Sequence, residues 1–210
     1  EAIVPGTLGK ASGSLHVFVA LIANTIFFIA QSGVWAFLER MAAQAGLAHE
    51  TVGTMLAISV SLAIAGPLAA SLIADRYGRA VPLAVVAVGQ LAALWILQGP
   101  MTAVLFLIAA TGFQIFWNFA IPYIVAIVAT LDRGRRYIVL VTPFQAAGIA
   151  LGPVLAGTLA GEGELSLVAT LGSAAVLASV VLLFPYALRY RGGRTQAEKE
   201  EPQSGREASD

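Results

Sequence analysis

The chain has 210 residues, of which 58% are hydrophobic and only 11% are charged. A soluble domain carries about 25% charged residues, so this chain has too few polar side chains to cover a water-soluble globule. Its expected surroundings are therefore a lipid bilayer. The formal net charge of zero argues against a nucleic-acid partner. The absence of cysteine excludes disulfides and thiolate chemistry.

Six apolar segments approach the roughly 20 residues that a helix needs to cross a bilayer. In chain order the predicted spans are 15–38, 51–74, 80–98, 101–130, 137–160 and 165–188. Residues 1–14 are predicted to be a cytoplasmic linker because proline and glycine recur in them. Residues 189–210 are polar and charged, which predicts a disordered cytoplasmic tail. The expected fold class is an all-α integral membrane protein with six transmembrane helices in one bundle.

Basic residues fall on alternate connections between the predicted spans, and this alternation sets the expected orientation in the membrane. One set of connections contains Lys10, Arg76, Arg79, Arg133, Arg135, Arg136, Arg189, Arg191 and Arg194. The opposite set contains Arg40 and four glutamates. Because positively charged connections stay in the cytoplasm, we expect both termini to be cytoplasmic, in a protein of the cell membrane.

The connection between the second and third predicted spans, residues 71–79, places one acid and two bases in a short turn. Asp75, Arg76 and Arg79 lie where one helix ends and the next begins, and Gly78 supplies the backbone freedom of a tight turn. There a carboxylate faces the amides of a helix N-terminus and a guanidinium faces the carbonyls of a C-terminus. We expect a conformational latch that holds neighbouring helices in one arrangement and releases them in another.

This turn resembles the signature loop of the major facilitator superfamily of secondary transporters, which runs Gly-x-Leu-Ala-Asp-Arg-x-Gly-Arg and then a basic residue. The matching residues are Ala74, Asp75, Arg76, Gly78 and Arg79. Ser71 and Ala80 depart from the pattern, which fits the family's degenerate copy between helices eight and nine. The resemblance implies the C-terminal six-helix half of a transporter whose halves are parallel repeats. Residues 131–136 repeat this chemistry, as a second latch or as a plain positively charged loop.

Two predicted spans carry polar and aromatic side chains along one face. The first contributes Asn24, Phe28, Gln31 and Trp35, and the fourth contributes Gln114, Trp117, Asn118 and Tyr123. Spacings of three, four and seven residues keep side chains on one helix face. In the superfamily the first and fourth helices of each half line the central cavity, so the resemblance implies that these residues line a substrate cavity. We add Gln145 of the fifth span. The alternative is that such amides bond across helix interfaces within the bundle.

Two prolines predict bends in the spans. Pro122 removes a backbone donor inside the fourth span and is expected to kink it, as a flexing point or as a static packing feature. Gly66 and Pro67 predict a bend in the second span.

The fifth span contains glycines that permit close approach of a second helix. Gly148 and Gly152 form a small-xxx-small pair. Together with Pro153 they resemble the glycine-proline signature that antiporters of the superfamily carry in helix five. The match covers only the Gly-x-x-x-Gly-Pro core, so it implies no antiport.

No Asp, Glu, Lys, Arg or His lies in the middle of a predicted span. A proton-coupled carrier normally needs a buried titratable group, so proton coupling would rely on Glu39 at the outer end or on a group outside this chain. Glu39 is expected to pair with Arg40 or to be exposed to solvent. His16 and His49 are expected at opposite membrane faces, so the sequence implies no metal site, and it implies no cofactor.

The sequence therefore predicts half of a secondary transporter that moves a small organic solute by alternating access. Its partners are the lipid bilayer, the solute and a second six-helix half. Because residue 1 is Glu, we expect a processed chain or a fragment, so that the second half belongs to the same polypeptide. Because the two halves of the family are parallel repeats, another copy in a homodimer is the alternative. A non-transporting membrane scaffold is the alternative function. An intramembrane enzyme is not expected, because no nucleophile, acid pair or metal-ligand set lies at membrane depth.

Overall fold

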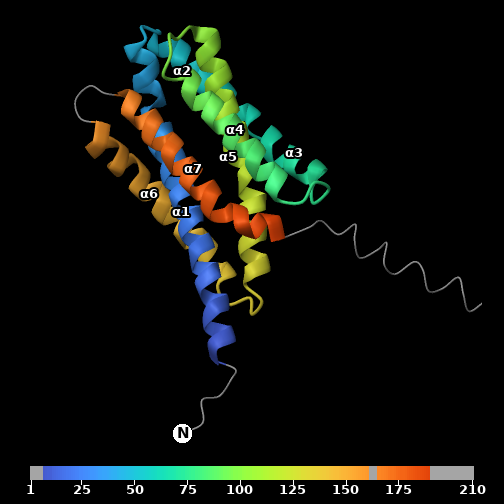
Figure 1. The fold of residues 1–210 in the computed structure, drawn as a ribbon. Helices are drawn as coiled ribbons and strands as arrows, with labels where there is room; N and C mark the ends of the chain where they lie inside the picture. Colours follow the sequence, from blue (N-terminus) through green and yellow to red (C-terminus); the bar gives the residue numbers. More distant parts are fainter. Residues whose placement is uncertain (1–6, 161–164, 190–210) are drawn as a thin grey trace, which may run out of the picture.

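A computed structural model describes residues 7–160 and 165–189, with the side chains of residues 14–158 and 165–189. The regular structure of the described residues is helical throughout (Figure 1). The elements are α1 (Thr7–Gln44), α2 (His49–Leu62), α3 (Ala65–Ile73), α4 (Ala80–Ile96), α5 (Ala103–Leu131), the short 3-10 helix η1 (Ile138–Leu140), α6 (Val141–Ala160) and α7 (Leu165–Arg189).

Five helical segments in the described ranges are long and apolar enough to cross a membrane. They are Ser14–Gln44, His49–Ile73, Ala103–Leu131, Ile138–Thr158 and Leu165–Arg189. The third predicted span corresponds to α4, which is apolar but has 17 residues, short of the roughly 20 that a span needs. Each predicted span is thus helical, the second as α2 followed by α3, and all but the third are long enough to cross a membrane.

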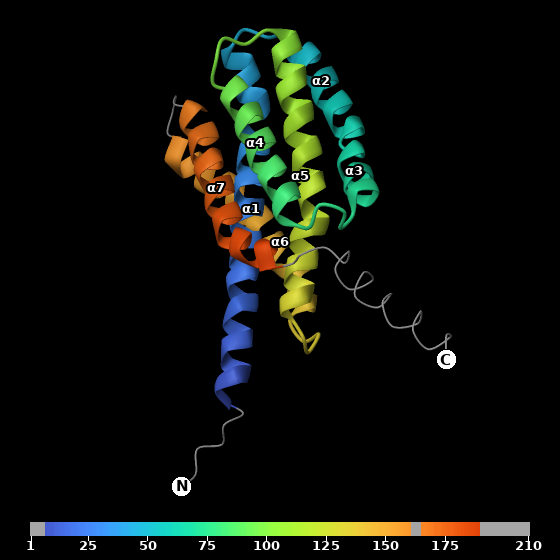
Figure 2. The same cartoon turned by 45° about the vertical axis from the view of Figure 1, so that its right-hand side comes forward.

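The start of the first helix differs from the sequence prediction. α1 begins at Thr7, so residues 7–14 are helical, although their glycines suggested a linker. Figure 2 shows this end of α1 extending beyond the other helices. An isolated glycine costs a helix only about 1 kcal/mol, which the continuous 38-residue helix overrides. The other residues of the predicted linker and tail, 1–6 and 190–210, lie outside the described residues.

The connections alternate between the two ends of the bundle. Residues 74–79 and 132–137 lie at the same end as Thr7 and Arg189, the lower end in Figure 1. Residues 45–48 and 97–102 lie at the upper end. The arginines of the described connections therefore gather at the lower end, in agreement with the alternation of charge along the sequence.

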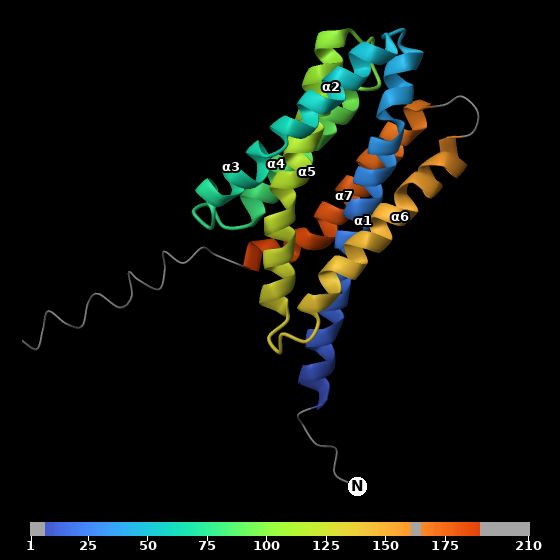
Figure 3. The same ribbon diagram turned by 180° about the vertical axis from the view of Figure 1, so that it is seen from behind.

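α1 lies at the centre of the bundle, where it packs against α5, α6 and α7. α4 packs against α5 and α7, and α2 and α3 pack against α5. α4 and α7 face the viewer in Figure 1, whereas α2, α3, α5 and α6 are nearest in the opposite view (Figure 3). Two large apolar clusters fill the interior, one towards each end, and Trp117 packs against both. A smaller third cluster consists of Ala30, Val176 and Val180.

The second span bends between α2 and α3, as Gly66 and Pro67 predict. Pro67 has no N–H to offer the carbonyl of Ala63. Instead, the N–H of Gly66 donates to the Ala63 carbonyl at 3.0 Å in a tighter turn. A Cβ at Gly66 would lie 2.8 Å from the backbone nitrogen of Phe119, so glycine allows α3 to lie directly against α5.

The glycines of α6 lie at the contact with α1. A Cβ at Gly148 would be 2.7 Å from the carbonyl oxygen of Thr25, and a Cβ at Gly152 would be 2.6 Å from that of Ile29. The hydroxyl of Ser32 donates to the Gly148 carbonyl at 3.2 Å. The two helices therefore meet backbone to backbone, with no room for side chains between them.

We expect Gly152→Ala to destabilise the protein by about 1–3 kcal/mol, the usual cost of forcing extra atoms into a packed interior. The atoms that the new methyl group would meet include the backbone of α1, which cannot yield as a flexible side chain would. The thermal unfolding temperature of the purified protein in detergent measures the effect.

Gly53→Ala is the matched control, because a Cβ at Gly53 of α2 would meet nothing within 4 Å. That change should leave stability unaltered or raise it slightly, since alanine is the better helix former. Equal unfolding temperatures for the two variants would contradict the close contact between α1 and α6.

Candidate functional site

A hydrogen-bonded pair of amides joins three helices inside the bundle. Gln31 of α1 and Gln90 of α4 are both fully buried. The Nε2 of Gln90 donates to Oε1 of Gln31 at 3.2 Å and to the carbonyl of Phe113 in α5 at 3.1 Å. The stripe pattern misses Gln90, because α4 carries no polar stripe. The signal that identifies it is a lone amide inside an otherwise apolar span.

A second pair of amides joins α1 to α6, nearer the lower end. The Nε2 of Gln145 donates to Oδ1 of Asn24 at 3.4 Å. Asn24 is fully buried, and Gln145 is half-buried. The structure thus brings together two residues that the sequence predicts for one cavity.

Aromatic side chains connect the stripe of α1 with that of α5. The rings of Phe28 and Trp117 meet edge to face, with their centroids 6.2 Å apart. The ring of Phe113 also meets that of Trp117 edge to face, with their centroids 6.1 Å apart. Edge-to-face contacts are the favourable geometry for aromatic pairs. Since Trp117 is the central residue of α5, the two stripes meet at the middle of the helix.

Other predicted cavity residues turn towards different neighbours. Asn118 donates to the carbonyl of Gln114 in its own helix at 2.9 Å, and Gln114 itself is buried. Tyr123 is also buried, and its hydroxyl lies 3.4 Å from the carbonyl oxygens of Ala70 and Ala74, at the end of α3. These interactions direct Tyr123 towards α3 and away from α1.

The remaining residues singled out in the sequence are Trp35 and two prolines. Trp35 is half-buried and packs against the apolar cluster of the upper end. Pro122 lies inside α5, which continues as a helix to Leu131, and Pro153 lies inside α6.

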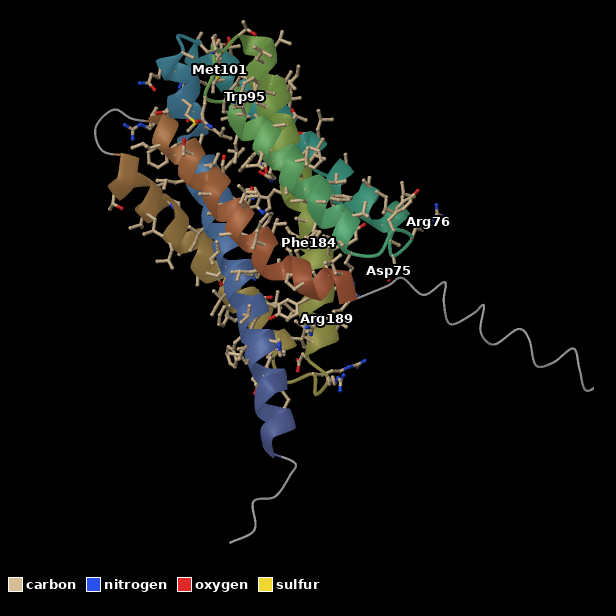
Figure 4. The ribbon with its side chains drawn as sticks, in the orientation of Figure 1. Asp75, Arg76, Trp95, Met101, Phe184 and Arg189 are labelled. Carbon is tan, nitrogen blue, oxygen red and sulfur yellow. The ribbon has the colours of Figure 1, made fainter. Side chains whose placement is uncertain are left out.

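The turn between α3 and α4 has the backbone shape that its glycine predicts. Gly78 has a φ of +67°, and Ala74 has a φ of +43°, a value that residues with a Cβ rarely adopt. Asp75 and Arg76 are exposed and project from the bundle, at the same end as Arg189 (Figure 4).

Arg79 points into the bundle, unlike its neighbours in the turn, and is only 7% exposed. Its Nη1 donates to the carbonyl of Ala126 at 2.8 Å and to the hydroxyl of Thr130. Its Nε lies 3.9 Å from the carboxylate of Asp75. Ala126 and Thr130 belong to the last turns of α5, where the helix dipole favours a cation. Arg79 therefore fastens the turn to α5 within the same bundle.

Asp132 organises the charged connection that follows α5. Its carboxylate is 4% exposed and accepts hydrogen bonds from the N–H groups of Arg136, Tyr137 and Ile138 at 3.2, 2.7 and 2.8 Å. Burial acts to raise the pKa of Asp132, but the three N–H donors and the positive charge of Arg136 outweigh it and lower the pKa. The carboxylate stabilises the start of η1, a structural role that the sequence analysis does not include.

The end of α1 and the start of α2 are joined by a side-chain contact that the sequence analysis does not predict. Nδ1 of His49 lies 2.8 Å from the carboxylate of Glu39, whereas Arg40 lies over the ring of Phe37. Glu39 therefore faces His49 and not Arg40, and its side chain is 51% exposed, in agreement with the other expectation, exposure to solvent. Among the residues whose side chains are described, no three His, Asp or Glu side chains form a metal-binding group.

An all-helical bundle of apolar spans, with amides and an indole at its middle and basic turns at one end, defines a polytopic membrane protein. The model of the family described as the Major Facilitator Superfamily matches residues 20–208. The chain therefore belongs to the major facilitator superfamily, whose members are membrane transporters. No curated protein and no solved structure gave a significant match.

We expect Asp132→Ala to loosen the start of η1, because three backbone amides lose their acceptor. The free energy of local opening should fall by about 1–3 kcal/mol. Hydrogen–deuterium exchange of residues 136–138, expressed as protection factors, measures it. Glu50→Ala, at an exposed acid of the opposite end, is the control. Unchanged protection in the Asp132 variant would contradict the capping role.

The protection of residues 136–138 should also depend on pH. Because the pKa of Asp132 is lower in the folded than in the unfolded protein, its stabilisation is fully present above the unfolded value of about 4. It is lost as the pH falls through the folded value. Wild-type protection should therefore drop below about pH 4, and the Asp132→Ala variant should show no such step.

Proposed function

We propose that this chain is one six-helix half of a secondary transporter that moves a small organic solute by alternating access. The observation that carries the proposal is the set of buried polar groups at the middle of α1 and α5, in a chain of this family. Polar side chains at membrane depth are costly. The two helices that carry them line the solute cavity between this half and its partner.

The partner is a second six-helix half, and it packs against α2, α3 and α6. These helices expose large apolar side chains, among them Leu72, which is 74% exposed, and Val154. α4 and α7 lie on the opposite side of the bundle (Figures 1 and 3) and face the lipid. At 1.5 Å per residue, the 17 residues of α4 cover about 25 Å of the roughly 30 Å hydrocarbon layer, so α4 counts as the sixth span.

The basic end of the bundle is cytoplasmic, in keeping with the distribution of arginine. There Asp75 and Arg76 form the latch towards the second half, since both are exposed. Arg79 holds the turn on α5 through the Ala126 carbonyl, so a movement of α5 carries the latch with it.

The solute is uncharged or carries an aromatic group. The side chains proposed for the cavity are neutral amides and aromatics, and a charged solute would have no counter-charge among them. The acidic side chains Glu39, Glu50, Asp75 and Asp132 lie at the ends of the described helices. If transport is coupled to protons, the coupling acid belongs to the second half.

A membrane scaffold is the second candidate function. It is favoured by the hydrogen bonds that some stripe residues make within the bundle, such as Gln31 to Gln90 and Asn118 to Gln114. Amides that only bridge helices would need no solute. The two functions differ in whether any compound crosses the membrane.

Uptake into vesicles tests the proposal. The protein from the complete reading frame is reconstituted and given a panel of neutral sugars, aromatic drug-like molecules and carboxylates, with and without an imposed proton gradient. Saturable uptake of one class is the expected result. Correct insertion without uptake of any compound would favour the scaffold. Six further spans in the reading frame would exclude the homodimer.

We expect Asp75→Asn to slow transport of the compound so identified by roughly tenfold, within the usual range of coupling energies between conformational states. Insertion and folding should be unaffected, because the side chain is exposed. Initial uptake rates measure the effect. Glu50→Gln, an exposed acid at the opposite end of the bundle, should leave the rate unchanged. Full activity of the Asp75 variant would rule out the latch.

A further inference from the structure

An apolar groove runs along one face of α1, bordered by α6 and in its upper part also by α7. Its lower part is a hollow of about 330 Å³, lined by Ile22, Thr25, Ile26, Pro143, Phe144 and Ala147. Its upper part is a hollow of about 200 Å³, whose lining begins with Ile29 of α1. Ile22, Ile26 and Ile29 follow one another at spacings of four and three residues, which keeps them on one helix face. The two hollows therefore lie end to end along α1.

The groove exists because α6 and α7 pack against α1 from different sides and touch each other far less. Figure 3 shows α1 between these two helices. Towards α6, a Cβ at Gly33 would lie 3.0 Å from the carbonyl oxygen of Gly152. Towards α7, a Cβ at Gly172 would lie 2.5 Å from Cγ2 of Val34. These close contacts hold both helices against α1, and the small residues along them leave the space between α6 and α7 unfilled.

The groove lies on the far side of α1 from the proposed cavity. Ile22 and Ile26 stand two residues before and two residues after Asn24, and at 3.6 residues per turn this spacing directs them away from it. Ile22 is 50% exposed, whereas Asn24 is fully buried. The hydroxyl of Thr25 donates to carbonyl groups of α1 and α6, so this polar group is already paired. The groove therefore presents apolar surface to the bilayer and not to the solute pathway.

The length of the groove suits one leaflet of the bilayer. Phe18 lies one turn before Ile22 and is 39% exposed, and the upper hollow begins at Ile29. From Phe18 to Ile29, α1 rises by about 17 Å at 1.5 Å per residue. Half of the hydrocarbon layer is about 15 Å thick. An acyl chain that enters beside Phe18 therefore extends along the whole lower hollow.

Basic side chains lie beside the lower end of the groove. The ring of Phe18 meets that of Tyr137 with their centroids 5.4 Å apart, and Tyr137 directly follows the connection that holds the arginines. These are Arg133, Arg135 and Arg136, and all three are exposed. Asp132, the one acid of this connection, is buried and accepts hydrogen bonds from backbone N–H groups. The surface beside the entrance of the groove is therefore positively charged.

We propose that this groove binds an anionic phospholipid from the leaflet at the basic end of the bundle. One acyl chain lies along Phe18, Ile22 and Ile26, and the phosphate lies beside the arginines of residues 133–136. Because the walls of the groove are as apolar as the surrounding lipid tails, the chain contributes through close packing, and the charge of the headgroup sets the preference. Each basic residue near an anionic headgroup confers about a fivefold preference.

This inference goes beyond the proposed transport function and does not depend on it, because a membrane scaffold with the same groove would bind the same lipid.

Lipid binding measured by native mass spectrometry tests the inference. The purified protein from the complete reading frame is titrated with dioleoyl phosphatidylglycerol or with dioleoyl phosphatidylcholine. The two lipids have the same acyl chains, and only the first has a net negative charge. Phosphatidylglycerol should bind at least about fivefold more tightly than phosphatidylcholine.

Ala147→Phe tests the groove itself. Ala147 is exposed and lines the lower hollow, so a phenyl ring at this position fills the hollow without entering the core. The variant should lose the tightly bound phosphatidylglycerol. Ala84→Phe is the matched control and should retain the lipid, because Ala84 is an exposed residue of α4, on the lipid side of the bundle and outside the groove.

Arg136→Gln tests the contact with the headgroup. Removal of this charge should weaken phosphatidylglycerol binding by about fivefold and leave phosphatidylcholine binding unchanged. The variant keeps the backbone N–H that donates to Asp132. Arg40→Gln, at an exposed arginine near the opposite end of α1, is the control and should bind both lipids as the parent does.

Equal affinity for the two lipids would overturn the inference, because it would show an apolar surface without recognition of the headgroup. Retention of phosphatidylglycerol by Ala147→Phe would show that the lipid lies elsewhere, and an equal loss in Arg40→Gln would show only a general effect of charge. Absence of bound lipid would show that the groove is closed, for example by the second half. The comparison of the two lipids uses the unaltered protein, so it does not depend on the folding of any variant.

Lipid binding and solute uptake separate this inference from the proposed function. If phosphatidylglycerol binds as expected and no solute is taken up, the inference stands and the proposed function falls. If uptake succeeds and the protein shows no preference for phosphatidylglycerol, only this inference falls.

Discussion

Backbone contact between α1 and α6 is the constraint on which the rest of the bundle depends. Gly148 and Gly152 leave α6 no side chain at this contact, and Ser32 bonds across it. The contact fixes the rotation of α1 about its own axis. Since α1 also carries the amide stripe, this rotation decides that Asn24 faces α6 and Gln31 faces α4.

In two buried amides of α1 the side-chain oxygen joins neighbouring helices, while the side-chain nitrogen makes no hydrogen bond to the described residues. The oxygens of Asn24 and Gln31 accept hydrogen bonds from neighbouring helices, while their nitrogens have no partner among the residues that the structure describes. A side chain held in place by one such bond presents its second group in a fixed direction. The two explanations that the sequence leaves open, helix bridging and cavity lining, are therefore not exclusive, because the two roles would use different atoms of one amide group.

The sequence predicts much of the fold because the thickness of the hydrocarbon layer sets the length of a span. The sequence also predicts the tight turn at Gly78, because such a turn requires a positive φ, which glycine adopts readily. The sequence does not distinguish the role of Arg76 from that of Arg79, because the two residues lie in the same turn and have the same charge. Which of them contacts α5 depends on the path of that turn in space. The partners of Gln90 and Tyr123 are hidden from the sequence for a similar reason, because a side chain's position on one helix does not reveal which neighbouring helix it meets.

Ala74 stands in a conformation that costs a residue with a Cβ about 1–3 kcal/mol. Its N–H donates to the Ala70 carbonyl at 2.7 Å, and its own carbonyl lies 3.4 Å from the Tyr123 hydroxyl. These contacts hold the strained backbone directly before Asp75. The turn therefore stores backbone strain. A movement that breaks the contacts of Ala74 with Ala70 and Tyr123 releases this strain, so the charged loop changes conformation at a lower energy cost than a relaxed turn would.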